Sequence, residues 1–255
     1  MYGAGRTDKG QVRSNNEDAI FFSNEPVGVL PNLYIVSDGM GGHRSGEVAS
    51  QNAVELFRCY VLDNRRHNSW QSQTEGLQED KLLDYMISGV NYANNAVYEL
   101  SLTSFDLSGM GATFSACVIW DGRVYIAHVG DSRVYAAGGG KISQLTIDHT
   151  YVNEMVRSGR MNESEAKTHP KRNIITRALG VDPDLEVDGY VVPLDNTDII
   201  LLCSDGLSNM LTDEELCAVV VQNTDAERKV DELITLSNQR GGMDNISVVL
   251  VDMKR

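Results

Sequence analysis

The chain has 255 residues, of which 42% are hydrophobic and 23% charged, and its formal net charge at pH 7 is -14. This length fits one large domain or two small ones, and the hydrophobic share suffices for a core. The negative charge argues against non-specific binding to nucleic acid or to acidic membranes, because both need basic surfaces. The N-terminal segment MYGAGRTDKG lacks the apolar core of a signal peptide, and no run approaches the roughly 18 apolar residues of a membrane span.

The four cysteines lie within apolar segments and lack the C-x-x-C spacing of zinc and redox sites. We interpret them as reduced core residues, and we expect a cytoplasmic protein without disulfides. They are Cys59, Cys117, Cys203 and Cys217.

Residues 2–22 are expected to form short strands, and they carry Arg13, Glu17 and Asp18. Arg13 taken alone is more simply a surface residue, although a guanidinium is the best side chain for gripping two phosphate oxygens. Because neighbouring residues of a strand point to opposite faces, Glu17 and Asp18 cannot both face one metal ion in the same way.

The apolar run at 33–36 predicts one buried strand, and Asp38 follows directly behind it with Gly39 next and His43 a little further on. A carboxylate at the end of a buried strand suits a hard cation, because Mg²⁺ and Mn²⁺ prefer oxygen ligands. Glycines after it let main-chain atoms approach a phosphate closely. A single Asp-Gly pair, however, is more often only a turn.

The same arrangement recurs elsewhere in the chain, where further acids stand at the ends of apolar, strand-like segments. Asp131 follows residues 124–129, Asp205 follows residues 199–203, and Asp244 precedes residues 246–251. Separate turns could explain each case, but four cases with one layout favour a single shared site that the fold assembles from distant segments.

Between these acids, apolar residues at helical spacing predict one helix over 49–60 and another over 83–100. A polar connection without periodicity separates them at about 62–78. Residues 110–145 change to a strand pattern with turns at 121–122 and 138–140, which predicts an antiparallel meander.

Residues 150–180 are polar and short-helical, so we expect either a flap beside the site or a solvated connector. Strands are expected at 185–192 and 199–203. Helices are expected to begin at Thr212 and Thr224, because each is followed three residues later by glutamate, as in a capping box. Blocks of strands bracket blocks of helices, which favours an α+β fold with antiparallel sheets.

Acidic side chains that converge in this way repel one another unless cations neutralise them. Two hard cations about 3.5–4 Å apart could share a carboxylate and a water, and aim a hydroxide at phosphorus. Arg13 would then hold the phosphate oxygens, and His43 is a candidate acid for the leaving alkoxide. There is no G-x-x-x-x-G-K-[ST] loop for nucleotides and no cysteine in a phosphate-cradling loop. The converging acids are Asp18, Asp38, Asp131, Asp205 and Asp244.

Eight motifs occur along nearly the whole chain: RSNNED (13–18), VSDGMGGHRSGE (36–47), SGMGATF (108–114), HVGDSRVY (128–135), LTIDHT (145–150), ITRALG (175–180), LLCSDGL (201–207) and GGMDNISVVLV (241–251). In these motifs and in their order, the chain resembles the metal-dependent protein serine/threonine phosphatases of the PPM, or type-2C, family in their bacterial form. The resemblance implies a four-layer αββα sandwich of two antiparallel sheets flanked by helix pairs. It also implies a single phosphatase domain over 1–255, with a flap subdomain at about 150–180.

The same resemblance implies roles at a centre of two Mn²⁺ or Mg²⁺ ions with a third, weaker one. Asp38 would bridge two ions, the Gly39 carbonyl would bind one of them, and Asp205 and Asp244 would bind the other. Asp18 would act on a metal-bound water, and Asp131 would share the third ion with Asp205.

The role of His43 stays open in this comparison. Eukaryotic members carry their proposed acid histidine directly after Asp-Gly, where this chain has Met40. His43 is therefore either the general acid or a structural histidine beside the metals.

The implied function is hydrolysis of phosphoserine and phosphothreonine in phosphorylated proteins, as the reverse partner of a cognate bacterial serine/threonine kinase. One alternative is a metal-free pseudophosphatase that only binds phosphoproteins. The presence of all five acids argues against this alternative. Another is a narrow phosphatase of one anti-sigma-type regulator, a class that generally carries extra membrane or regulatory domains.

Overall fold

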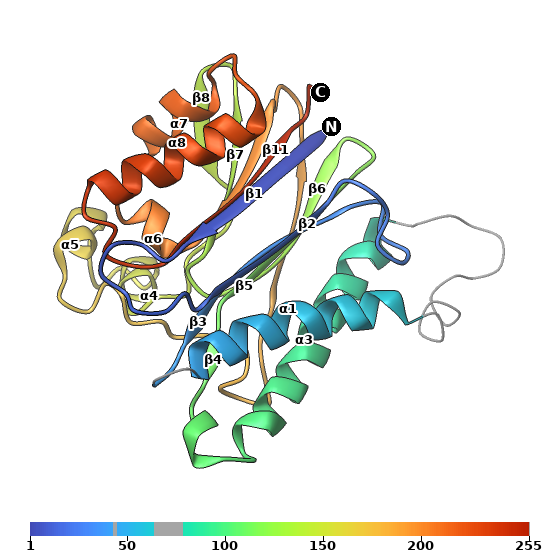
Figure 1. The fold of residues 1–255 in the computed structure, drawn as a ribbon, viewed down its shortest axis with the longest axis vertical. Helices are drawn as coiled ribbons and strands as arrows, with labels where there is room; N and C mark the ends of the chain where they lie inside the picture. Colours follow the sequence, from blue (N-terminus) through green and yellow to red (C-terminus); the bar gives the residue numbers. More distant parts are fainter. Residues whose placement is uncertain (43–44, 64–78, 255) are drawn as a thin grey trace.

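The computed structural model describes residues 1–42, 45–63 and 79–254. Two antiparallel sheets lie face to face, with helices covering both outer faces (Figure 1). In spatial order the five-stranded sheet contains β1 (Tyr2–Asp8), β11 (Ile246–Asp252), β10 (Ile199–Cys203), β7 (Arg133–Gly138) and β8 (Lys141–Gln144). The other sheet contains β2 (Asp18–Ser23), β3 (Leu33–Met40), β5 (Phe114–Trp120), β6 (Arg123–Val129) and β9 (Asp188–Pro193), with β4 (Gly111–Ala112) paired to β3.

The helices fall into two groups on opposite sides of the sandwich. The long helices α1 (Ser45–Leu62) and α3 (Glu79–Ser101) cover the sheet that contains β3, and the short η1 (Phe105–Leu107) follows them. The other sheet is covered by α6 (Asp205–Ser208), α7 (Asp213–Val220) and α8 (Ala226–Gln239). Between these groups in sequence lie α4 (Tyr151–Arg157) and α5 (Glu163–Thr168).

Three apolar clusters fill the spaces between these four layers. One lies between α1, α3 and the sheet of β3, one lies between the other sheet and α6–α8, and the third lies between the two sheets. The sequence of β3 is continuously apolar because both faces of this strand are buried. Leu33 and Ile35 pack toward the helices, whereas Tyr34 and Val36 pack between the sheets. The predicted αββα sandwich is therefore confirmed.

The predicted meander over 110–145 is wrong in one respect. Strands β5 and β6 pair in one sheet, whereas β7 and β8 pair in the other, so the chain changes sheets between Val129 and Arg133. The alternation of apolar and polar residues along a strand indicates which of its faces is buried. It does not indicate which sheet the strand joins. Asp131 lies in this crossing.

Three further predictions are corrected by the structure. The capping box at Thr212 is present, but α8 is capped by Asp225 rather than Thr224, because the Asp225 side chain accepts the Arg228 amide at 2.9 Å. The strand expected at 185–192 is β9, which begins only at Asp188. All four cysteines are free as predicted, yet Cys59 is exposed.

Residues 150–180 contain α4 and α5, and most of their side chains are exposed. Backbone bridges between Thr150 and Ile175 and between Ala112 and Leu179 tie the two ends of this segment to the sandwich. Whether it acts as a flap stays a prediction. The connection expected at 62–78 lies almost entirely outside the described residues. Among the helices that the structure describes, none is long and apolar enough to cross a membrane.

Candidate metal centre

The five predicted acids lie at or close to the ends of strands in the two packed sheets. Asp18 and Asp38 are directly opposed in the register of β2 and β3, so their side chains project from the same face. Asp205 begins α6 immediately behind the buried strand β10, and Asp244 stands just before β11. Together with Asp131, these residues are contributed by both sheets.

The backbone at Asp38 is fixed by Thr113, which the motif reading did not single out. The Asp38 amide donates to Thr113 Oγ1 at 2.8 Å, and the Thr113 amide donates to the Asp38 carbonyl at 2.8 Å. Thr113 Oγ1 also lies 2.7 Å from Ser132 Oγ, beside Asp131. One buried threonine therefore joins the end of β3 to the crossing between the sheets.

Asp18 and its neighbour Glu17 are held by Ser204 and Asn245, which the sequence did not reveal as functional. The Ser204 hydroxyl donates to Asp18 Oδ2 at 2.8 Å and accepts the Ser247 amide at 2.9 Å. The Asn245 side chain accepts the Glu17 amide at 2.8 Å. Ser204 precedes Asp205 and Asn245 follows Asp244 in the sequence. Their position next to these acids is the signal from which a supporting role could have been predicted.

Glycine is required at Gly39 by the close approach of another chain segment. A Cβ atom there would lie 2.0 Å from the Gly46 carbonyl oxygen and 2.6 Å from that of Glu17. The Gly39 amide donates to the Glu17 carbonyl at 3.1 Å. This packing fixes the backbone whose carbonyl the sequence assigned to a metal, and it brings Glu17 to the same place.

The carboxyl groups strongly disfavour simultaneous ionisation. Burial and then the charge of neighbouring acids raise the pKa of Asp38 well above its usual range. Burial first and acidic neighbours second also raise the pKa of Asp18 to about 7, of Asp131 to about 8 and of Asp205 to about 6. Asp18 and Asp131 are 6% and 8% exposed, whereas Asp38 and Asp205 are half-buried.

Three carboxylate oxygens of this cluster are buried without any hydrogen-bond partner: Asp18 Oδ1, Asp131 Oδ1 and Asp205 Oδ1. Unpaired buried acceptors are costly, and oxygen is the donor atom that Mg²⁺ and Mn²⁺ prefer. The donor set therefore fits hard divalent cations. Within the described ranges, however, no three acidic, histidine or cysteine side chains already converge on one point. Ion binding would require some of these side chains to turn from their present partners.

One such partner is Arg13, whose Nη2 donates to Asp244 Oδ2 at 2.7 Å. The Arg13 side chain is 53% exposed, so its guanidinium faces solvent at the edge of the acidic cluster. It is thus near enough to contact both the cluster and a ligand that approaches it. The remaining predicted residue, His43, lies outside the described residues.

Comparison with known proteins gives a consistent family. The model of the family described as "Protein phosphatase 2C" matches residues 3–250. The serine/threonine phosphatase stp of Listeria welshimeri is 38% identical over 256 residues, which cover 99% of this chain and 96% of that protein.

Solved structures agree with the sequence comparison. A bacterial serine phosphatase superposes with a TM-score of 0.88 at 31% identity, covering 99% of this chain and 98% of the other. A PPM Ser-Thr phosphatase of Mycobacterium smegmatis, solved in complex with cacodylate, gives a TM-score of 0.78 at 30% identity and covers 99% and 98% of the two chains. The chain belongs to the protein phosphatase 2C family.

Proposed function

We propose that this chain hydrolyses phosphoserine and phosphothreonine esters of proteins at the acidic edge of its two sheets, with Mn²⁺ or Mg²⁺ as the cofactor. Protein serine/threonine phosphatase activity is the function of its family relatives, and divalent-metal dependence follows from the family. The observation that carries the proposal is the set of unpaired, buried carboxylate oxygens on Asp18, Asp131 and Asp205. A phosphoprotein-binding module without metal would have no need for three uncompensated buried acceptors.

Divalent ions bound here would neutralise the cluster, lower the pKa of a water and offset the charge of the phosphate. Asp38 and the Gly39 carbonyl would hold the ion nearer β3. Asp205 and Asp244 would hold its neighbour, and Asp131 would bind a third ion with Asp205. These assignments agree with the position of each residue at a strand end.

The chain's own groups supply the remaining steps. Asp18, held by the Ser204 hydroxyl at 2.8 Å, would act on the attacking water as a general base. Arg13 would release Asp244 and grip two oxygens of the substrate phosphate. Cacodylate in the Mycobacterium smegmatis relative is a tetrahedral oxyanion like phosphate, which supports an oxyanion site in this fold. His43 remains the candidate acid for the leaving serine or threonine oxygen.

The biological setting proposed is cytoplasmic, with phosphorylated proteins as substrates and a cognate serine/threonine kinase as the opposing enzyme. Residues 150–180, whose ends are tied to the sandwich while most side chains face solvent, would serve as a flap that contacts these substrates.

The test is dephosphorylation of a phosphothreonine peptide in the presence of Mn²⁺, for the wild type and two matched variants. Asp205→Asn should lose activity and bind less Mn²⁺ in calorimetry. Asp121→Asn is the control, because Asp121 lies in an exposed turn with φ 48°, which asparagine adopts readily. Full turnover of the wild type in excess EDTA would refute the metal-dependent mechanism.

A further inference from the structure

We propose that His149 is a positioning residue for the Asp131 carboxylate: it grips the backbone of Gly130, and Asp188 sets the orientation of its ring. The inference rests on the proposed role of Asp131 as a metal ligand. His149 lies outside the acidic cluster, in a separate segment of the chain. The inference is that the geometry of the cluster depends on it.

Both backbone polar groups of Gly130 are bonded to His149. The Gly130 amide donates to His149 Nδ1 at 3.0 Å, and the His149 amide donates to the Gly130 carbonyl at 2.8 Å. Gly130 has φ 102°, which favours glycine, and a Cβ there would lie 2.6 Å from the Thr113 side chain. The direction in which the chain leaves β6, and hence the placing of Asp131, is set at this residue.

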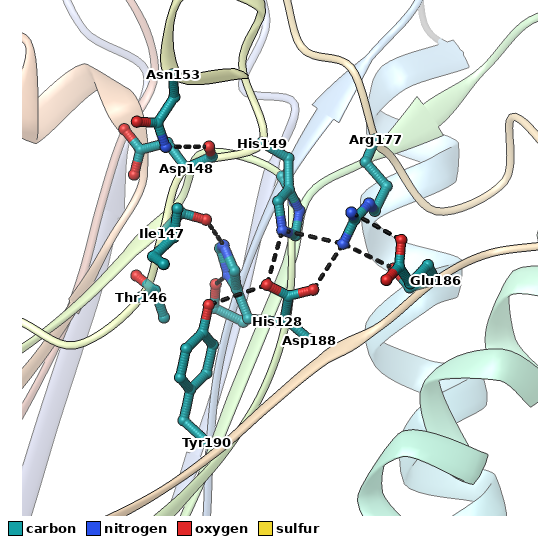
Figure 2. A network of polar contacts seen from close by, with 12 residues as sticks. His128, Thr146, Ile147, Asp148, His149, Asn153, Arg177, Glu186, Asp188 and Tyr190 are labelled. Atoms are coloured by element: carbon teal, nitrogen blue, oxygen red, sulfur yellow. Dashed lines mark hydrogen bonds and ion pairs between the residues drawn. The ribbon is translucent and has the colours of Figure 1, made fainter. Parts of the chain in front are cut away.

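The hydrogen bonds also define which ring nitrogen carries the proton. His149 Nδ1 accepts from an amide, so in the neutral ring the proton is on Nε2. Nε2 lies 3.2 Å from Asp188 Oδ2 and 3.2 Å from Arg177 Nη1. Figure 2 shows both contacts, and the protonated Nε2 donates to the carboxylate, because Arg177 can only donate. Burial lowers the pKa of His149 despite this carboxylate, which keeps the ring neutral. A protonated Nδ1 would face the Gly130 amide, donor against donor.

Asp188 is itself fixed by groups other than His149. Arg177 Nη1 donates to Asp188 Oδ1 at 2.6 Å, and the Tyr190 hydroxyl donates to Asp188 Oδ2 at 3.0 Å. Arg177 also pairs with Glu186 at 2.9 Å. Figure 2 shows the Asp188 carboxylate joined to His149, Arg177 and Tyr190. An orienting carboxylate with this many partners holds the imidazole in one position.

The segment in which the chain crosses between the sheets, from Val129 to Arg133, is also held at its Arg133 end. Asp148, next to His149, pairs with Arg133 Nη2 at 2.7 Å, two residues beyond Asp131. The His149 carbonyl accepts the Thr176 amide at 2.9 Å. Adjacent residues therefore clamp both sides of Asp131, and the same segment is bonded to the returning end of residues 150–180.

Mn²⁺ binding, measured by calorimetry, tests this role without any assay of activity. His149→Ala should weaken the site that contains Asp131 by about 10- to 100-fold, the usual effect of removing an orienting partner of a metal ligand. His149→Asn keeps an acceptor oxygen on the side that faces Gly130 and should recover most of the loss. His169→Ala is the matched control and should bind Mn²⁺ like the wild type, because it removes an imidazole that contacts Tyr151 and the Lys171 amide rather than Gly130 or Asp188.

A double-variant cycle then separates positioning from general destabilisation. In an Asp131→Ala background, His149→Ala should cause no further loss of Mn²⁺ binding, because the ligand that it positions is already gone. Long-range ¹H–¹⁵N spectra should show the His149 ring of the wild type protonated at Nε2 only. A His149→Ala protein that melts at a lower temperature yet binds Mn²⁺ like the wild type would overturn the inference alone. A wild type that binds no Mn²⁺ would overturn both the inference and the proposed function.

Discussion

Replacing Asp38 by asparagine removes the charge that the cluster tolerates least. Asp18 and Asp38 are opposed in register, and the side chains of such a pair begin about 5 Å apart, at their Cβ atoms, on one face of the sheet. Two charges at about 5 Å repel by about 3 kcal/mol at an effective dielectric constant of about 20. Asparagine carries no charge, and its amide can donate to a neighbouring carboxylate. We therefore expect Asp38→Asn to be more stable than the wild type without metal.

The pH dependence of this difference has a definite sign. Burial and mutual repulsion raise the folded-state pKa values of Asp18 and Asp131 to about 7 and about 8, above the ordinary value of an aspartate. At these two residues the folded state holds more protons than the unfolded state, so their contribution to stability is fully present below about pH 4 and is lost as the pH rises toward 8. The advantage of Asp38→Asn should therefore be small near pH 5 and reach about 2 kcal/mol near pH 8.5, a shift of about 4–8 °C in Tm.

Calorimetric scans of both proteins at pH 5 and pH 8.5, with and without Mn²⁺, make the measurement. Mn²⁺ at about 100 times its Kd should stabilise the wild type by about 2.7 kcal/mol, and it should stabilise Asp38→Asn much less. Asp121→Asn, outside the cluster, should match the wild type in every scan. The reasoning is refuted if Asp38→Asn is less stable than the wild type at pH 8.5 without metal, or if Mn²⁺ stabilises both proteins equally.

Further predictions concern single groups. Arg13→Ala should raise KM for a phosphopeptide about tenfold or more while Mn²⁺ affinity stays near the wild-type value, because Arg13 grips substrate; steady-state kinetics and calorimetry measure the two effects. Burial lowers the pKa of His128 to about 3, so stability is lost as the pH falls below about 6.5, and His128→Gln should flatten this limb in urea titrations from pH 7 to pH 4. Gly39→Ala should lower both Tm and the Mn²⁺-induced rise in Tm, because its Cβ would lie 2.0 Å from the Gly46 carbonyl oxygen.

The positions of the acids could be predicted because each follows or precedes a buried strand, and buried strands are visible as apolar runs. Asp38 behind β3 and Asp205 behind β10 are the clearest cases. What apolar runs do not encode is the partner of each strand. The strand pattern therefore predicts one meander through Asp131, although the chain changes sheets there.

Local signals failed where two neighbouring residues offered the same chemistry. Thr224 and Asp225 can both cap a helix, and the three-residue spacing to a glutamate favoured the wrong one. For contacts over long sequence separations, no local pattern identifies the partner. The bond from Asn245 to Glu17 joins residues 228 apart, and that from His149 to Asp188 links two segments whose sequences give no sign of each other.

Thr113 shows what such a hidden contact contributes, and it yields a sharp test. This residue is 1% exposed, and its hydroxyl oxygen serves both the Asp38 amide at 2.8 Å and the Ser132 hydroxyl at 2.7 Å. Thr113→Val keeps the shape but leaves a buried amide without an acceptor, at a cost of about 1–3 kcal/mol. We expect a Tm lower by about 2–12 °C and Mn²⁺ binding weaker by about tenfold or more.

The matched variant is Thr113→Ser, which keeps the hydroxyl and loses only the methyl group that Gly130 packs against. It should bind Mn²⁺ like the wild type, although its Tm falls a little through the lost methyl contact. Because valine keeps the methyl and serine keeps the oxygen, the pair separates packing from hydrogen bonding. Equal Mn²⁺ affinities in the two variants would mean that the hydroxyl does not position Asp38. The link from β3 to the crossing would then be one of packing alone.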